Sequence, residues 1–148
     1  MSAYRRILVA VDGSGAAARG LREAVRLAKA EGARLCLLHV VNEFDAYIAM
    51  EGAGLGTDLL ATLRDGGRRI LAKAQALAER HAVKATSVLR QVTGGPAADT
   101  IVREARKQRA DLIVLGTHGR RGVRRLVLGS DAEQVVRTAS VPVLLVRG

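Results

Sequence analysis

The sequence predicts a single α/β domain: an open parallel sheet with helices on both faces. Short, mostly continuous apolar runs bounded by turn residues alternate with segments of helical periodicity along the 148 residues. Runs of the first kind predict strands, several of them buried on both faces as in parallel sheets. They cover residues 5–12, 33–42, 83–92, 111–116 and 141–147. Such alternation implies right-handed crossovers and a sheet covered on both sides.

Amphipathic helices are predicted between these strands. Apolar residues three or four positions apart form one face, with Arg, Lys and Glu opposite, at residues 21–28, 63–78, 98–105 and 135–139. Gly32 follows the first of these helices, and Pro96 suits the first turn of the third. Residues 43–58 carry four acidic side chains and no basic one, and we expect an irregular loop there, serving as a lid or a partner surface.

Length and composition fit one soluble domain, covering residues 1–148. No apolar run approaches the roughly 18 residues that a membrane-spanning helix needs. Arg5 and Arg6 precede an apolar run, as in a secretory signal, but Asp12 ends that run too early. Cys36 is the one cysteine, so no internal disulfide is expected. We therefore expect a cytoplasmic protein with no membrane association.

The net charge of +10 suggests an anionic partner. From Ile101 onward, ten Lys or Arg residues face four acidic ones, so the positive charge leans toward the C-terminal part. Nucleic acid is the less favoured anion, because aromatic residues make up 2% of the chain and no base-stacking platform or base-reading motif is present.

The last predicted strand, from Val141 to Arg147, is expected at an edge of the sheet. It contains Pro142, which lacks an N–H group and is largely confined to edges or strand starts. An apolar edge strand invites pairing with another chain. We therefore expect a homodimer formed through this strand.

Two glycine-bearing turns compete for a ligand. The first, from Gly13 to Ala18, matches the dinucleotide pattern G-x-G-x-x-[GA], but a lone match is weak and we interpret it as a plain tight turn. Asp12 ends the strand before it. Its carboxylate either accepts hydrogen bonds from ribose hydroxyls or lies near a metal ion, or it binds the N–H groups of Gly13 or Ser14 to form the turn.

The second turn combines Gly116 and Gly119 with Gly129 and Ser130, nine residues further on. It is not a Walker A loop. The first two glycines let the backbone approach a ligand and take positive φ. The last two residues open a helix whose N–H groups favour anions. The arrangement predicts a cradle for phosphates.

Several side chains in this segment have two interpretations. Ser130 and Glu133 also form an S-x-x-E capping box, which explains the serine without a ligand. His118 is a phosphate or ribose contact, or a polar loop residue. Arg120 is best placed to reach a phosphate. Of the remaining spacer residues, we expect a basic face exposed to solvent, formed by Arg121, Arg124 and Arg125. We expect an apolar set that packs against the protein, formed by Val123, Leu126 and Val127.

The pattern G-x2-G-x9-G-[ST] resembles the ATP-binding signature of the universal stress protein family, and the likeness extends over essentially the whole chain. It includes RRILVAVDGS, LLHVV, ADLIVLGTHG and LVLGSDAEQVVRTASVPVLLV. The resemblance implies a Rossmann-like sheet of order 3-2-1-4-5, usually dimeric, which binds ATP, with or without Mg²⁺, and has no established catalytic task.

The resemblance also implies site residues. Asp12 would contact the ribose, and Val41 would border the adenine. The phosphates would be surrounded by Gly116, His118, Gly119, Gly129 and Ser130. Where ATP-binding members often carry a small apolar residue and then Ser or Thr, this chain has Asp131 and Ala132. Asp131 would lie at the phosphates, and the preference among ATP, ADP and AMP stays open.

Three functions follow from these observations. The favoured one is a regulatory or stress-response module that binds an adenine nucleotide. A slow ATP hydrolase or phosphotransferase is the alternative, but it needs a positioned base and a metal clamp. Asp12 is the only carboxylate placed near the cradle, so we do not expect fast hydrolysis. A basic nucleic-acid-binding protein is the third, and its binding would fall steeply with salt.

Overall fold

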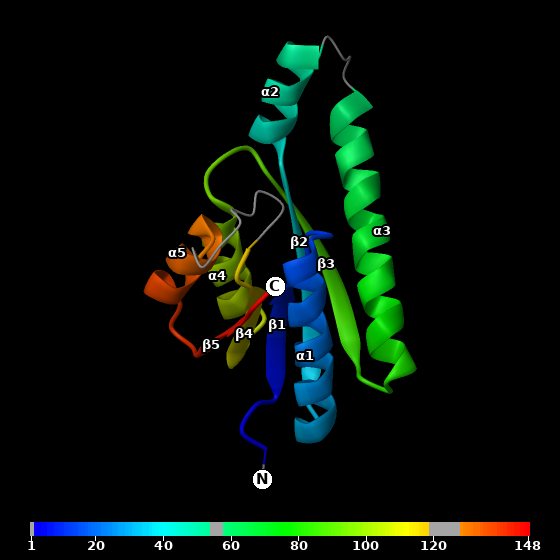
Figure 1. Cartoon of the computed structure of the whole chain (residues 1–148), viewed down its shortest axis with the longest axis vertical. Coiled ribbons are helices and arrows are strands. Elements are labelled where there is room, and N and C mark those ends of the chain that lie inside the picture. Colours follow the sequence, from blue (N-terminus) through cyan, green and yellow to red (C-terminus); the bar gives the residue numbers. More distant parts are fainter. Residues whose placement is uncertain (1, 54–57, 119–127) are drawn as a thin grey trace.

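The computed structural model describes residues 2–53, 58–118 and 128–148, and its strands form one five-stranded sheet of order β3-β2-β1-β4-β5. All strand pairs are parallel (Figure 1). This confirms the predicted fold class and strand order. In chain order the elements are β1 (Arg6–Ala10), α1 (Gly15–Glu31), β2 (Arg34–Asn42), α2 (Glu43–Ala53), α3 (Asp58–Arg80), β3 (Ala85–Val92), α4 (Ala97–Lys107), β4 (Leu112–Gly116), α5 (Ser130–Thr138) and β5 (Val143–Val146).

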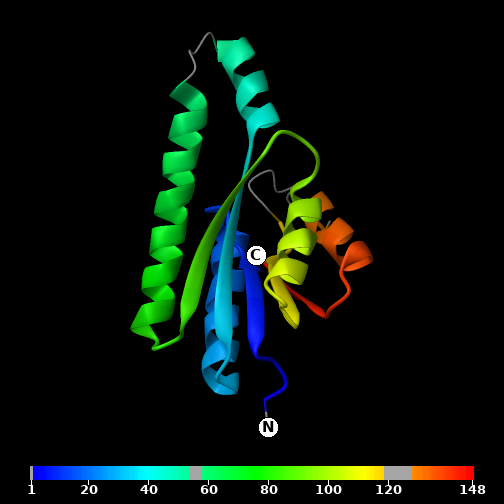
Figure 2. The same ribbon diagram turned by 180° about the vertical axis from the view of Figure 1, so that it is seen from behind.

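The helices cover both faces of the sheet. Ile7, Val9 and Leu37 belong to the core cluster that α1 and α3 cover, whereas Leu8 and Leu38 belong to the cluster under α4 and α5. All five side chains are fully buried. Figures 1 and 2 show the two helical layers from opposite sides. The continuous apolar runs in the sequence arise because alternate residues face two different cores.

The central strand β1 pairs with β2 on one side and β4 on the other, with Val9 opposite both Leu37 and Val114. The chain order of the strands reverses between β1 and β4. In open α/β sheets, ligands bind outside the carboxyl ends of the strands at such a point. This edge of the sheet therefore carries the candidate site.

The two ends of α1 and the start of α4 lie at or next to residues that favour helix ends. Ser14 caps α1, since its hydroxyl accepts a hydrogen bond of 3.1 Å from the N–H of Ala17. Gly32 ends α1 with φ 69°, as predicted. Pro96 lies at the N-cap of α4, one position before the predicted first turn.

The prediction of an irregular loop over residues 43–58 was wrong, because α2 occupies residues 43–53. The side chain of Asn42 accepts a 3.0 Å hydrogen bond from the N–H of Phe44 at the start of this helix. Glu43 and Asp45 place negative charge in its first turn, which favours a helix N-terminus. Ala46 is buried while Phe44 and Tyr47 are exposed, so α2 lacks the broad apolar stripe by which helices are recognised in sequence.

The strand β5 lies at the edge of the sheet, as Pro142 predicted. The carbonyl of Pro142 accepts a 3.0 Å hydrogen bond from the N–H of Ile113, just before β5 begins. Within the described ranges, no helix is both long and apolar enough to cross a bilayer.

Candidate functional site

Asp12 shapes the turn that leaves β1. Its carboxylate accepts a 2.9 Å hydrogen bond from the N–H of Ser14. Gly13 between them has φ 83°, a conformation that favours glycine. Asp12 therefore forms the turn, and the hydrogen bond with Ser14 holds its carboxylate at the carboxyl end of β1. A contact of Asp12 with ribose stays a prediction.

Gly116 ends β4. We expected a glycine here because it can take positive φ, but Gly116 does not use this freedom, since its φ lies outside that region. A Cβ at this position would lie 2.6 Å from the carbonyl carbon of Ala16 and 2.8 Å from the nitrogen of Ala17. The glycine is required because β4 packs directly against the first turn of α1. This packing brings the end of β4 beside the start of α1.

Thr117 joins three parts of the site, a role that sequence reasoning missed. Its N–H donates to the carbonyl of Val146 at 3.0 Å, and its carbonyl accepts from the N–H of Gly129 at 2.7 Å. Its hydroxyl lies 3.4 Å from the N–H of Gly148. The end of β4 is thus held between the start of α5 and the end of β5. In the sequence, the signal that could have indicated this role is a polar, β-branched residue directly after a buried strand.

The N-cap of α5 lies one residue earlier than predicted. Gly129, not Ser130, is the N-cap, with φ −59° and ψ 149°, and makes no side-chain capping bond. Its carbonyl accepts from the N–H of Glu133 at 2.9 Å. The expected capping box of Ser130 is therefore wrong, because Ser130 is already the first helical residue. The N–H groups of the first helical turn, residues 130–132, have no acceptor within the helix.

The carboxylate of Asp131 is bound to the start of α4. One of its oxygens accepts a 3.3 Å hydrogen bond from the N–H of Ala98 in the first turn of α4. Gln134 donates a 2.9 Å hydrogen bond to Asp99 beside it. The negative charge of Asp131 is thus used to cap α4. A contact of Asp131 with phosphate stays a prediction.

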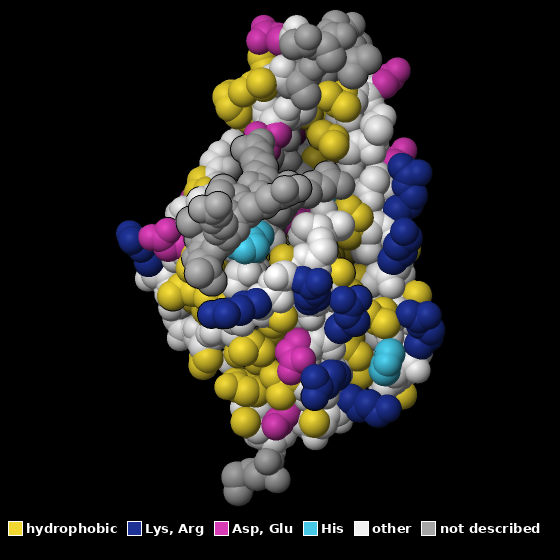
Figure 3. Space-filling model, viewed as in Figure 1, with side chains coloured by type: hydrophobic (Ala, Val, Ile, Leu, Met, Phe, Trp, Pro, Cys, Tyr) yellow, Lys and Arg dark blue, Asp and Glu magenta, His cyan; other side chains and the backbone are white. Residues whose placement is uncertain are grey.

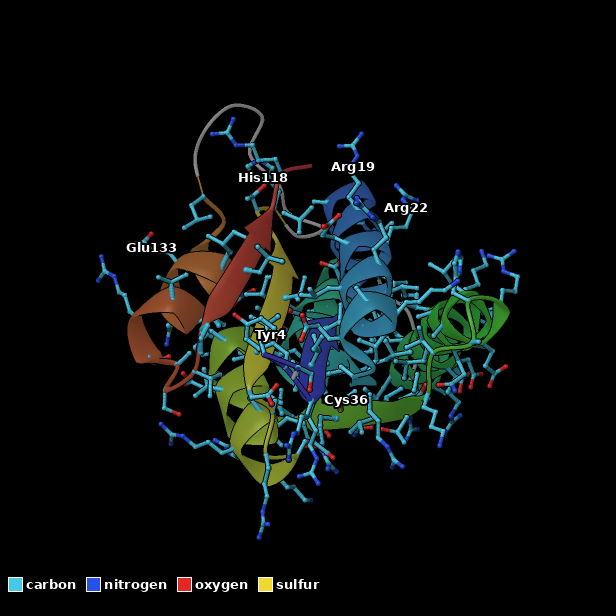
Figure 4. All side chains as sticks on the ribbon, turned by 90° about the horizontal axis from the view of Figure 1, so that it is seen from below. Tyr4, Arg19, Arg22, Cys36, His118 and Glu133 are labelled. Atoms are coloured by element: carbon cyan, nitrogen blue, oxygen red, sulfur yellow. The ribbon has the colours of Figure 1, made fainter. Side chains whose placement is uncertain are left out.

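His118 and Val41 flank this edge of the sheet. The Nδ1 atom of His118 is buried and has no hydrogen-bond partner among the described residues. Figure 4 shows His118 beyond the end of β4, near the last strand. Val41 is buried at 3% exposure near the carboxyl end of β2. Their nucleotide contacts stay predictions.

The remaining predicted contacts, Gly119 and Arg120, lie outside the described residues. The same holds for the rest of the basic and apolar spacer, residues 121–127. The structure does bring together the two ends of the spacer, through the hydrogen bond between Thr117 and Gly129. In the described part of the chain, no group of three His, Cys, Asp or Glu residues is placed to hold a metal ion.

Cys36 lies on the other face of the sheet, in the core under α4 and α5. Burial raises the pKa of its thiol to about 11, and the negative charge of Glu104 adds to this effect. The thiol is therefore protonated at neutral pH, as in structural cysteines.

The fold defines a doubly wound α/β protein whose strand order reverses between β1 and β4. The sequence pattern of the universal stress protein family matches residues 3–147. The chain belongs to this family. A universal stress protein of Thermus aquaticus is 35% identical over 147 residues, which cover 97% of this chain and 99% of that relative.

Solved structures of the family have the same fold. The universal stress protein UspA of Lactobacillus plantarum superposes with a TM-score of 0.82 at 26% identity, covering 99% of this chain and 100% of that one. A universal stress protein of Archaeoglobus fulgidus in complex with dAMP has a TM-score of 0.68 at 27% identity, covering 97% and 98%. A further universal stress protein structure, in complex with cAMP, has a TM-score of 0.66 at 27% identity, covering 99% of this chain and 98% of that one.

Proposed function

We propose that this protein binds ATP between the carboxyl ends of β1 and β4 and acts as a regulatory module rather than a fast enzyme. In this proposal the phosphates lie against the first turn of α5. The ribose lies near Asp12, and the adenine lies near Val41. Gly119 and Arg120 would complete the phosphate contacts, and Mg²⁺ would accompany the phosphates.

The observation that carries the proposal is the hydrogen bond of 2.7 Å from the N–H of Gly129 to the carbonyl of Thr117. It holds the N-terminus of α5, where the N-cap residue Gly129 makes no side-chain capping bond, beside the point where the strand order reverses. Donor N–H groups and the helix dipole at such a position favour phosphate. The carboxylate of Asp131 accepts a hydrogen bond from the first turn of α4.

The relatives support an adenine nucleotide in particular. Two solved family structures contain dAMP and cAMP, which share the adenine base and one phosphate. The triphosphate itself is the finer part of the proposal. It rests on the length of the glycine-bounded segment from Gly116 to Ser130 and on the basic residues within it.

Regulation would act through dimer contacts at β5. Among the described strands, β5 has a neighbour on one side only, so its other side suits pairing with a second copy. Thr117 binds both Gly129, at the proposed phosphate site, and Val146, in the edge strand. A nucleotide bound at the site would therefore affect the dimer contact at β5 through Thr117. The expected setting is the cytoplasm, where the buried Cys36 stays reduced.

Equilibrium dialysis with ATP, ADP, AMP and GTP, with and without Mg²⁺, tests the proposal. We expect one adenine nucleotide bound per chain, with GTP excluded. Substituting Ser130 by proline would remove one donor N–H at a position where a helix tolerates proline. We expect about tenfold weaker binding of ATP from the loss of one charge-assisted hydrogen bond. Ser130→Ala is the matched control that keeps this N–H.

Sedimentation of the same protein tests the dimer. We expect twice the chain mass, and a monomer for Leu145→Pro, which removes an N–H from the edge strand. Leu145→Ala shortens the same side chain, keeps the N–H and should stay dimeric. Absence of any bound nucleotide at millimolar concentration would refute the ATP proposal, whatever the oligomeric state.

A further inference from the structure

His39 is a buried polar residue on β2 that the proposed site does not use directly. It is 7% exposed and lies on the face of the sheet that α1 and α3 cover. Its neighbour across the strand pair is Leu89 of β3. A histidine at such a position needs a hydrogen-bond partner, because an unsatisfied polar group in the core is costly.

That partner is the main chain at the end of β1. The Nδ1 atom of His39 lies 2.7 Å from the carbonyl oxygen of Val11. A carbonyl oxygen only accepts, so Nδ1 carries the hydrogen and donates it. The N–H of Val11 in turn donates to Leu38 at 2.8 Å. Both polar groups of Val11 are thus tied to neighbouring residues of β2, directly before Asp12.

The helix α3 leaves space for this imidazole ring because it has a glycine at the point of contact. Gly67 lies on its buried side, and a Cβ there would come within 2.5 Å of the Cδ2 atom of His39 and 3.0 Å of its Nε2 atom. Glycine inside a helix costs about 0.5–1 kcal/mol relative to alanine. The neighbouring Gly66 has no heavy atom within 4 Å of the same hypothetical Cβ. Space for the His39 ring therefore explains Gly67 but not Gly66.

We propose that His39 is a positioning residue for the nucleotide site. Its Nδ1–H group holds the carbonyl of Val11, fixes the plane of the peptide between Val11 and Asp12, and so aims the Asp12 carboxylate at the ribose. Gly67 keeps the ring in place. This inference rests on the proposed function, since it assigns the aim of a side chain within the same site.

The first test compares His39→Leu with His39→Asn. The two replacements have similar shapes, but only the asparagine amide can donate a hydrogen bond from near the position of Nδ1. The probes are ATP and 2′,3′-dideoxy-ATP, measured by equilibrium dialysis on the full chain. Wild type should prefer ATP by about tenfold, the worth of one hydrogen bond to the charged Asp12.

In His39→Leu, ATP affinity should fall about tenfold while dideoxy-ATP affinity stays unchanged, so that the preference disappears. His39→Asn should keep most of the preference. Equal losses for both nucleotides, or an intact preference in His39→Leu, would overturn the positioning role and leave nucleotide binding standing. A wild type that binds neither nucleotide would instead refute the proposed function and this inference with it.

A second pair of variants tests the same role from α3. Gly67→Ala should displace the imidazole and reduce the preference for ATP over dideoxy-ATP, whereas Gly66→Ala should leave it unchanged. Circular dichroism would verify that both variants are folded. An unchanged preference in folded Gly67→Ala would count against the inference, because the ring would then not need this space to position Asp12.

Discussion

Position 116 requires glycine because β4 packs closely against α1 there. Its missing side chain lets β4 approach the main chain of Ala16 and Ala17 in α1, and Gly20 of α1 lies against the same point from the next helical turn. The sequence indicated a glycine at the end of a strand, which we interpreted as conformational freedom for a ligand. The actual reason was hidden from the sequence because the contacting residues are about 100 positions away.

Replacing Gly116 by alanine should destabilise the fold by about 2 kcal/mol, since overpacking against rigid main chain forces the helix or the strand to move. Gly15→Ala is the matched control, because a Cβ at Gly15 meets nothing within 4 Å. Urea unfolding of both variants measures the difference. Equal stability of Gly116→Ala and wild type would contradict the packing account.

Glu104 and Arg90 form an ion pair that joins α4 to β3. The Nη2 atom of Arg90 lies 2.7 Å from one carboxylate oxygen of Glu104, whose side chain is 3% exposed, against 39% for Arg90. Burial by itself raises the pKa of Glu104, but hydrogen bonds from Arg90 and Gln108 and the charge of Arg90 outweigh burial. The pKa of Glu104 is therefore lower than its ordinary value.

A lowered pKa in the folded state means that Glu104 stabilises the protein above its unfolded pKa, near 4.3, and that this contribution is lost as the pH falls through the folded value. We expect Glu104→Gln to cost about 2 kcal/mol at pH 7, since the buried carboxylate that accepts the hydrogen bonds of Arg90 is removed. The difference from wild type should shrink below about pH 4. Urea unfolding across this range measures it, and a difference independent of pH would contradict the assignment.

At the scale of secondary structure, periodicity predicted the strands and four of the helices because each buries a regular face. The predicted strands begin and end within two residues of β1 to β5. The four predicted helical patterns fall on α1, α3, α4 and α5, which are longer than the patterns. The helix α2 escaped prediction because Ala46 is its one buried side chain among those described. Its start depends on the Asn42 cap, a local signal that we did not weigh.

Two serines at helix starts were alike in sequence but differ in the structure. Ser14 caps α1 with its hydroxyl, whereas Ser130 lies one residue inside α5. Ser14→Ala should therefore cost about 1 kcal/mol and Ser130→Ala only a few tenths. Thermal unfolding of the two variants distinguishes them. A larger loss for Ser130→Ala would restore the capping box that the sequence predicted.

At the scale of the whole molecule, charge is unevenly distributed. Figure 3 shows Lys and Arg side chains gathered over α1 and α3, with acidic side chains prominent at the α2 end. Arg19 and Arg22 project from α1 toward solvent in Figure 4. Such a field raises the local concentration of anionic ligands in general. It does not select a nucleotide, because that selection depends on the groups at the candidate site.

The sequence predicted the sheet order through its family resemblance, and it named residues for the site whose nucleotide contacts stay predictions. It did not predict the contacts that join the elements at this edge of the sheet, namely Thr117 with Gly129 and Val146, and His39 with Val11. These join residues that are distant in the chain and use main-chain groups, which any residue carries. Their partners are therefore set by the topology and not by residue type.

The central claim is that main-chain N–H groups at the start of α5 hold phosphates beside the end of β4. The most direct measurement is an amide ¹H–¹⁵N NMR titration of the full chain with ATP. The account predicts that the largest shifts fall on residues 116–118 and 129–132, with smaller ones at Asp12 and Val41. Shifts confined to the basic surfaces of α1 and α3, or no shifts at millimolar ATP, would contradict it.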